Sequence, residues 1–190
     1  MNEDKQMNKI VFTAKELARI AVFIGLVIAA QFLLSSVPGV EIVTLLFAAF
    51  SFVYGCIRGV ISAVAFAILR QFLFGFFPTV LVLYLLYYPL LAAAFGLLGK
   101  WINGWQASAK KEIFTVVFAA SIACVCTVLF TLADNLLTPW ILSYTPKAAR
   151  LYFQASLPFL CTQLISVSVS VGLLFYPLTK ALFLLKSRSR

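Results

Sequence analysis

Residues 40–75, VEIVTLLFAAFSFVYGCIRGVISAVAFAILRQFLFG, decide how this chain folds. Two apolar runs, residues 40–54 and 60–69, are joined by a short Gly-Cys-Ile-Arg-Gly link. Apolar runs of this length separated by glycines predict two helices with a turn between them. We therefore expect an antiparallel pair of membrane helices, with residues 57–59 forming the turn at one membrane face.

The charged side chains of this stretch stand mainly near its two ends. Glu41 opens the first run, and Arg70 with Gln71 closes the second. In an antiparallel pair, Glu41 and Arg70 both lie toward the membrane face opposite the turn. Charged groups near hydrocarbon are energetically costly, and they mark functional sites by default. We therefore expect the functional site at this depth.

The whole chain is as apolar as this stretch. Its 190 residues are 63% hydrophobic and 11% charged, and the mean hydropathy is +1.04. A soluble domain of this size does not bury so much apolar surface, so the composition predicts an integral membrane protein with one domain, residues 1–190. Residues 1–13 are polar, and we expect a cytoplasmic leader there rather than a cleavable signal peptide.

Breaks in the apolar pattern divide the chain into six expected membrane spans. A span needs about 20 apolar residues, so six spans use most of the chain. An even number of spans places both termini on the same side of an all-α bundle. A short interfacial segment, ending at Pro158, is expected before the last span. The spans are residues 14–34, 40–54, 60–74, 80–98, 113–137 and 159–178.

The distribution of basic residues gives the orientation of this bundle. The chain has fifteen Lys and Arg residues against six Asp and Glu residues, and its net charge is +9. With both termini cytoplasmic, twelve of the fifteen lie on the cytoplasmic side and Arg70, Lys147 and Arg150 lie outside. This asymmetry is the one that the positive-inside rule expects. Because the basic residues form no soluble face, no nucleic-acid partner is expected.

The outer ends of these spans gather a polar and aromatic set. Tyrosine rings can stack on a flat ligand, while amides and charges can fix its polar edge, so the set predicts a pocket for a small amphipathic molecule. Gln31, Tyr144 and Gln154 lie near the same depth. The predicted substrate-binding residues are Glu41, Arg70, Gln71, Tyr84, Tyr87, Tyr88, Asp134, Asn135, Trp140 and Gln163.

Each of these residues also has a structural interpretation. Tyrosine and tryptophan are common interfacial anchors. Glu41 and Arg70 can pair with each other, because intramembrane charges usually find partners. Asp134 and Asn135 are residue types that favour caps and turns, so they can mark the end of a helix. The sequence leaves these alternatives open.

The first span carries a different signal. Small residues recur along it at Ala14, Ala18, Ala21, Gly25 and Ala29. Small side chains at this spacing allow another helix to approach closely, so the stripe predicts a partner-docking surface. Packing against helices of the same chain is the alternative.

Motifs for catalysis and metal binding are missing from the sequence. The chain has no His, no phosphate-binding loop, no His-Glu-x-x-His and no Gly-x-Ser-x-Gly. We therefore expect no enzymatic activity, no cofactor and no metal site. The four cysteines lie in or beside apolar runs and are interpreted as small apolar side chains.

Taken together, the pattern resembles the substrate-binding S components of energy-coupling factor (ECF) transporters, the prokaryotic vitamin-uptake systems of the ABC type. The resemblance covers nearly the whole chain. It rests on six short spans, the small-residue stripe, the run PGVEIVTLL at residues 38–46 and the link YGCIRG at residues 54–59. This link is similar to the aromatic-Gly-x-x-x-Gly turn of the family.

The resemblance implies a function for the whole chain. An S component binds a vitamin from outside, docks through its first helix onto a transmembrane T subunit, and depends on two cytoplasmic ATPases for energy. The implied location is the prokaryotic plasma membrane. Two other functions stay open: a stand-alone secondary carrier or small channel, coupled to protons through Glu41 or Asp134, and a membrane assembly protein without a ligand.

Overall fold

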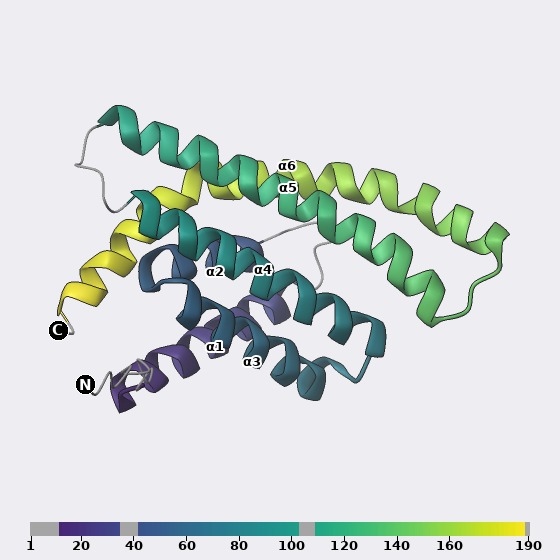
Figure 1. Ribbon diagram of the computed structural model, residues 1–190, viewed down its shortest axis with the longest axis horizontal. Helices are drawn as coiled ribbons and strands as arrows, with labels where there is room; N and C mark the ends of the chain where they lie inside the picture. The colour runs from purple at the N-terminus through teal and green to yellow at the C-terminus, as the bar shows by residue number, and fades with distance from the viewer. Residues whose placement is uncertain (1–11, 35–41, 103–108, 189–190) are drawn as a thin grey trace, which may run out of the picture.

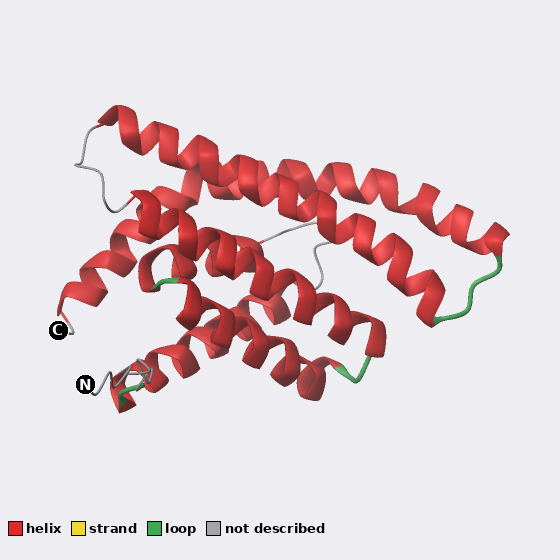
Figure 2. Cartoon of the chain, viewed as in Figure 1, coloured by secondary structure: helices red, strands yellow, loops and turns green. Residues whose placement is uncertain are grey.

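The computed structural model describes residues 12–34, 42–102 and 109–188, and nearly all of them are helical (Figure 2). No strand occurs within these ranges, which confirms the predicted all-α class. The helices are α1 (Ala14–Leu34), α2 (Ile42–Tyr54), α3 (Cys56–Phe74), α4 (Pro78–Ile102), α5 (Ala109–Ile141) and α6 (Pro146–Arg188).

Five of these helices, all but α2, are long and apolar enough to cross a membrane. Their outward faces carry large apolar side chains, such as Leu33, Phe72 and Leu136, which are 76%, 81% and 73% exposed. Such a surface is unfavourable in water and is matched by lipid hydrocarbon. The protein is therefore a multi-pass membrane protein.

Helix α2 is the exception, because it is short and enclosed. Its thirteen residues extend about 20 Å at 1.5 Å per residue, less than the hydrocarbon thickness of about 30 Å. Eleven of the thirteen are buried, and α2 packs against each of the other five helices. The stretch that the sequence singled out thus provides the centre of the bundle.

The junction between α2 and α3 depends on two glycines. Gly55 has a φ of 94°, in the region that favours glycine, and it separates the two helices. Gly96 of α4 lies so close to this junction that an added Cβ would be 2.3 Å from the Cα of Cys56. The predicted turn at residues 57–59 was wrong by a few residues: α3 already begins at Cys56, so Arg58 lies in its first turn.

Two other predicted boundaries were wrong because helices continue through proline. Helix α5 includes Pro139, and α6 is one helix of 43 residues that includes Pro158, where a separate interfacial segment was expected. Proline removes one backbone hydrogen bond but does not have to end a membrane helix, because a broken helix exposes more unpaired backbone groups to lipid.

Helices α5 and α6 form a long hairpin that extends past the turn between α3 and α4 (Figure 1). The chain direction alternates from each helix to the next, so the start of α1 and the end of α6 lie at the same end of the bundle (Figure 1). The bundle therefore has two distinct ends. We call the end with the start of α1 the terminal end, and the other the distal end.

Candidate functional site

A partly buried arginine lies at the distal end. The guanidinium carbon of Arg70, near the end of α3, is 5.0 Å from the ring centroid of Phe74 and 5.0 Å from that of Tyr84. Both rings therefore interact with the cation through their π faces.

Two hydrogen-bond donors of Arg70 have no partner in the described residues. Its Nε and Nη1 atoms are buried and have no hydrogen-bond partner within the described residues. The one ion pair in that part of the chain joins Glu16 and Arg58 at the terminal end. Glu41, the partner expected from the sequence, lies outside the described residues. A partly buried guanidinium with two buried donors that lack partners in the described residues is suited to binding a carboxylate or phosphate.

Three tyrosines of α4 extend this site. Residues 84, 87 and 88 are spaced three and four apart, so their side chains meet on one face of the helix. The ring centroid of Tyr88 is 4.9 Å from that of Tyr84 and 4.9 Å from that of Tyr87. Arg70 and Tyr84 lie together as the sequence predicted, and Tyr87 and Tyr88 are connected to them through ring contacts.

The tyrosine hydroxyl groups connect α4 to neighbouring helices. Tyr84 Oη accepts a hydrogen bond from Gln31 Nε2 of α1 at 3.1 Å. Tyr87 Oη shares a hydrogen bond of 3.2 Å with Thr44 Oγ1 of α2. Gln31 was expected near this depth, whereas Thr44 was missed because threonine within an apolar run carries little signal. The site therefore joins α1, α2, α3 and α4.

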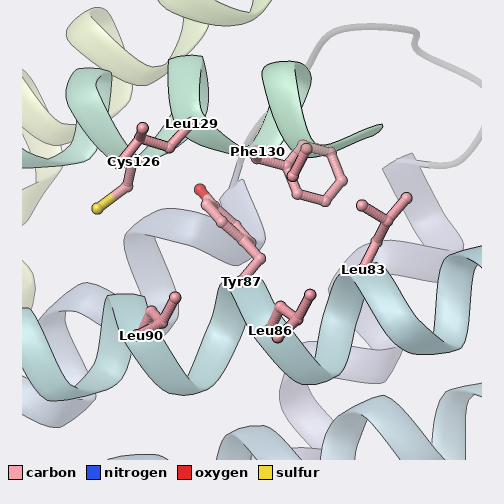
Figure 3. Close-up of a pocket in the computed structure, with 8 residues that line it drawn as sticks. Leu83, Leu86, Tyr87, Leu90, Cys126, Leu129 and Phe130 are labelled. Carbon is pink, nitrogen blue, oxygen red and sulfur yellow. The ribbon is translucent and has the colours of Figure 1, made fainter. Parts of the chain in front are cut away.

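A cleft of about 90 Å³ lies beside Tyr87, between α4 and α5 (Figure 3). It is smaller than the roughly 300–1,000 Å³ of typical ligand pockets, so it can hold only part of a ligand. Its lining is almost wholly apolar and consists of Leu83, Leu86, Tyr87, Leu90, Cys126, Leu129, Phe130 and Ala133.

Asp134 and Asn135 form a separate polar cluster within the α5–α6 hairpin. The carboxylate of Asp134 accepts hydrogen bonds from Thr138 Oγ1 at 2.5 Å and from Tyr152 Oη at 2.7 Å. Asn135 Nδ2 donates to Ser156 Oγ at 2.8 Å. The alternative that these residues mark a helix end was wrong, because α5 continues to Ile141. Their partners come from the hairpin itself rather than from the tyrosine site.

The other predicted site residues have surroundings of their own, and no contact with Arg70 is seen for them in the described part of the chain. Gln163 is buried, and its Oε1 accepts a hydrogen bond of 3.5 Å from Thr131 Oγ1. Trp140 lies in the last turn of α5 rather than in a loop, and its side chain is 78% exposed. Gln71 is buried in a cleft of its own. Their roles in substrate binding stay predictions.

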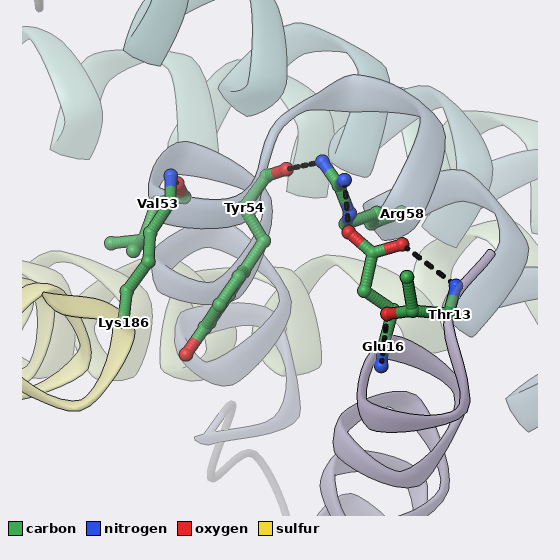
Figure 4. Close-up of polar contacts among 6 residues, drawn as sticks. All are labelled: Thr13, Glu16, Val53, Tyr54, Arg58 and Lys186. Atoms are coloured by element: carbon green, nitrogen blue, oxygen red, sulfur yellow. Dashed lines mark hydrogen bonds and ion pairs between the residues drawn. The ribbon is translucent and has the colours of Figure 1, made fainter. Parts of the chain in front are cut away.

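The terminal end holds a polar network that the sequence did not predict (Figure 4). Lys186 donates to the carbonyl of Val53, and Arg58 donates to the carbonyl of Tyr54 and pairs with Glu16. The two cations satisfy carbonyls at the carboxyl end of α2, where the helix dipole also favours positive charge. In the sequence, Gly55 could have indicated that a helix ends at this point and that its last carbonyls need hydrogen-bond donors.

The small-residue stripe of α1 faces away from the bundle. The buried residues of α1, such as Phe23 and Val27, lie on the opposite face. A Cβ added to Gly25 would meet nothing within 4 Å. The alternative of packing within this chain was therefore wrong for the described residues. All members of the stripe are exposed: Ala14, Ala18, Ala21, Gly25 and Ala29.

Fold and sites together define a multi-pass all-α membrane protein with a partly buried arginine–tyrosine site at one end. Comparisons with protein-family models, with curated proteins and with solved structures found no match to this chain. Its function is therefore inferred from the geometry of the site.

Proposed function

We propose that this chain is a membrane-embedded binding subunit for the uptake of a vitamin or related micronutrient, of the kind that serves ECF transporters. One observation carries the proposal: Arg70 is held between the rings of Phe74 and Tyr84, with Nε and Nη1 buried and unpartnered within the described residues. A ligand with a carboxylate or phosphate can supply the missing acceptors in a bidentate contact.

The tyrosines supply the second element of recognition. Aromatic rings bind a flat apolar ligand through stacking, and their hydroxyl groups can be redirected toward polar edges of the ligand. Because the cleft beside Tyr87 is small, binding of a whole vitamin requires side chains of the site to move apart. The proposed ligand is therefore flat, amphipathic and anionic.

The proposal includes an orientation in the membrane. In it, α2 counts as a sixth and short span, the terminal end faces the cytoplasm, and the distal end takes the ligand from outside a prokaryotic cell. Arg19, Arg58 and Lys186 then lie on the cytoplasmic side, as the positive-inside rule expects.

Energy for transport comes from other subunits in this proposal. The exposed small-residue stripe of α1 is the surface offered to a T subunit, which two cytoplasmic ATPases drive. The chain itself binds and does not catalyse. A ligand can change the docking equilibrium only if its affinity differs between the free and docked states.

Ligand identification tests the proposal. The purified protein is analysed by mass spectrometry for a co-purified small molecule, and a vitamin panel is titrated with tryptophan fluorescence as the signal. We expect one ligand with a carboxylate or phosphate group to bind. Failure of every member of a broad panel, with no co-purified molecule, would contradict the proposal.

A secondary carrier is the second candidate function, and Asp134 is the observation that favours it. This carboxylate lies within an apolar hairpin, and no cation pairs with it in the described part of the chain. Intramembrane acids of this kind can relay protons. Ligand uptake into liposomes that contain no ATPase, abolished by Asp134→Asn, would support the carrier and exclude the ECF role.

A further inference from the structure

Gln71 lies in a cleft on the outer face of the α3–α4 hairpin. The cleft has a volume of about 180 Å³ and is lined by Ile68, Gln71, Phe72, Phe76 and Leu81. Ile68, Phe72 and Phe76 are 45%, 81% and 69% exposed, so the cleft opens toward the surroundings of the bundle. In a membrane, those surroundings are lipid.

One polar atom in this apolar setting has no partner. Gln71 is only 5% exposed. Its Oε1 accepts a hydrogen bond from the backbone N–H of Phe77 at 3.1 Å, which fixes the orientation of the amide. Its Nε2 is buried and has no hydrogen-bond partner within the described ranges. An unpaired buried donor is unfavourable, so a group that enters the cleft with an acceptor gains a hydrogen bond.

The depth of Gln71 indicates which acceptor is available. It lies three residues before the end of α3, which is less than one helical turn of about 5.4 Å from the end of the span. Spanning helices end near the boundary between hydrocarbon and headgroups, so we infer that Gln71 lies near the ester carbonyls of glycerolipids. An ester carbonyl accepts hydrogen bonds and cannot donate them, and the attached acyl chain matches the apolar walls.

We propose that this cleft binds one acyl chain of a membrane glycerophospholipid, whose ester carbonyl accepts a hydrogen bond from Gln71 Nε2. The exposed side chains of Phe72 and Phe76 line the cleft and can turn aside to admit the chain. The cleft shares no residue with the arginine–tyrosine site, so the proposal does not depend on the proposed function. It assigns Gln71 to lipid rather than to the transported ligand.

Native mass spectrometry of the delipidated protein in detergent tests the proposal. Diester phosphatidylglycerol is added to one sample, and diether phosphatidylglycerol with the same chains and headgroup to another. Only the diester lipid has the carbonyl. We expect the wild-type protein to retain the diester lipid at several-fold higher occupancy, and equal retention of the two lipids would overturn the proposal.

Three variants test whether the retained lipid binds in this cleft. Gln71→Met should lower diester retention to the diether level, and Ile68→Trp should lower retention of both lipids by filling the cleft. Ile165→Trp, on an exposed face of α6, should change neither. If Gln71→Met folds and keeps the diester preference, the proposal is wrong. If Gln71→Met does not fold, the comparison of the diester and diether lipids on the wild-type protein still tests the proposal.

Discussion

The two ends of the bundle differ in how many of their buried polar groups have hydrogen-bond partners. At the terminal end, Arg58 and Lys186 donate to the last carbonyls of α2, and Arg58 also pairs with Glu16. At the distal end, polar atoms of Gln31, Arg70, Gln71 and Asn135 are buried without partners in the described part of the chain. Paired groups stabilise a fold, whereas unpaired donors and acceptors are costly unless a ligand meets them.

Ser51 is an exception at the terminal end, because its Oγ has no partner in the described residues although it lies near the α2–α3 junction. An added Cβ on Gly59 would lie 2.2 Å from that atom, so close packing by a neighbouring helix accounts for its enclosure. Asp134 is an exception at the distal end, because its carboxylate accepts hydrogen bonds from Thr138 and Tyr152. The contrast therefore predicts that changes at the terminal end affect stability, while changes at the distal end affect binding.

The largest effect is expected at Gly96. In Gly96→Ala the new methyl group would lie 2.3 Å from the Cα of Cys56 and 2.4 Å from its nitrogen. Backbone atoms cannot turn aside as side chains do. We therefore expect the free energy of unfolding to fall by about 3 kcal/mol or more, at the upper end of overpacking costs. Thermal unfolding in detergent measures it. Gly25→Ala is the matched control and should leave the melting temperature unchanged, because nothing lies within 4 Å of its Cβ.

Arg70 should show the opposite behaviour. Hydrogen bonds to charged groups contribute about 1.5–3 kcal/mol, so Arg70→Ala should weaken ligand binding by roughly 10–100-fold. Its melting temperature without ligand should stay the same or rise, because the variant removes two buried donors that lack partners in the described residues. Arg70→Lys should recover part of the affinity, since lysine keeps the charge but not the planar fork.

The control for Arg70 is Arg150→Ala, an exposed arginine of α6, which should bind normally. Calorimetric titration of each variant measures the affinities. Equal affinity of wild type and Arg70→Ala would show that Arg70 does not contribute to ligand binding. It would also contradict the proposed contrast between the two ends.

A smaller loss of stability is expected at Lys186. Lys186→Met removes a charged donor from the carbonyl of Val53, at a cost of about 1–2 kcal/mol. Ligand affinity should be unchanged. Lys180→Met, at an exposed position of the same helix, serves as the control and should have little effect on the melting temperature. A change in affinity without a change in stability would contradict the structural role of the terminal end.

The smallest effect is expected at Glu16. Its ion pair with Arg58 is partly open to solvent, since the two side chains are 18% and 41% exposed. Exposed ion pairs contribute little and are screened by salt. Glu16→Gln should lower the melting temperature less than Lys186→Met does. At high salt, Glu16→Gln and the wild type should have the same melting temperature. If Glu16→Gln still lowers the melting temperature at high salt, Glu16 stabilises the fold by more than a screened ion pair.

Apolar runs made much of the fold predictable from the sequence. The bounds of α1 coincide with the expected span, and the tyrosines of α4 share a face because helical spacing alone requires it. Asp134 could not be placed, because its partners depend on how α5 and α6 are rotated against each other. The caps of α2 were missed for a similar reason: Lys186 is distant in sequence from the carbonyl it meets.

Hydrogen exchange with and without ligand tests most directly which end of the bundle binds. Peptides that cover residues 68–88, at the distal end of α3 and α4, should exchange more slowly when ligand is added. Peptides that cover residues 50–58 and 178–188 should be unaffected. Ligand-dependent protection confined to the terminal end, or protection at neither end under saturating ligand, would contradict the assignment of the arginine–tyrosine site.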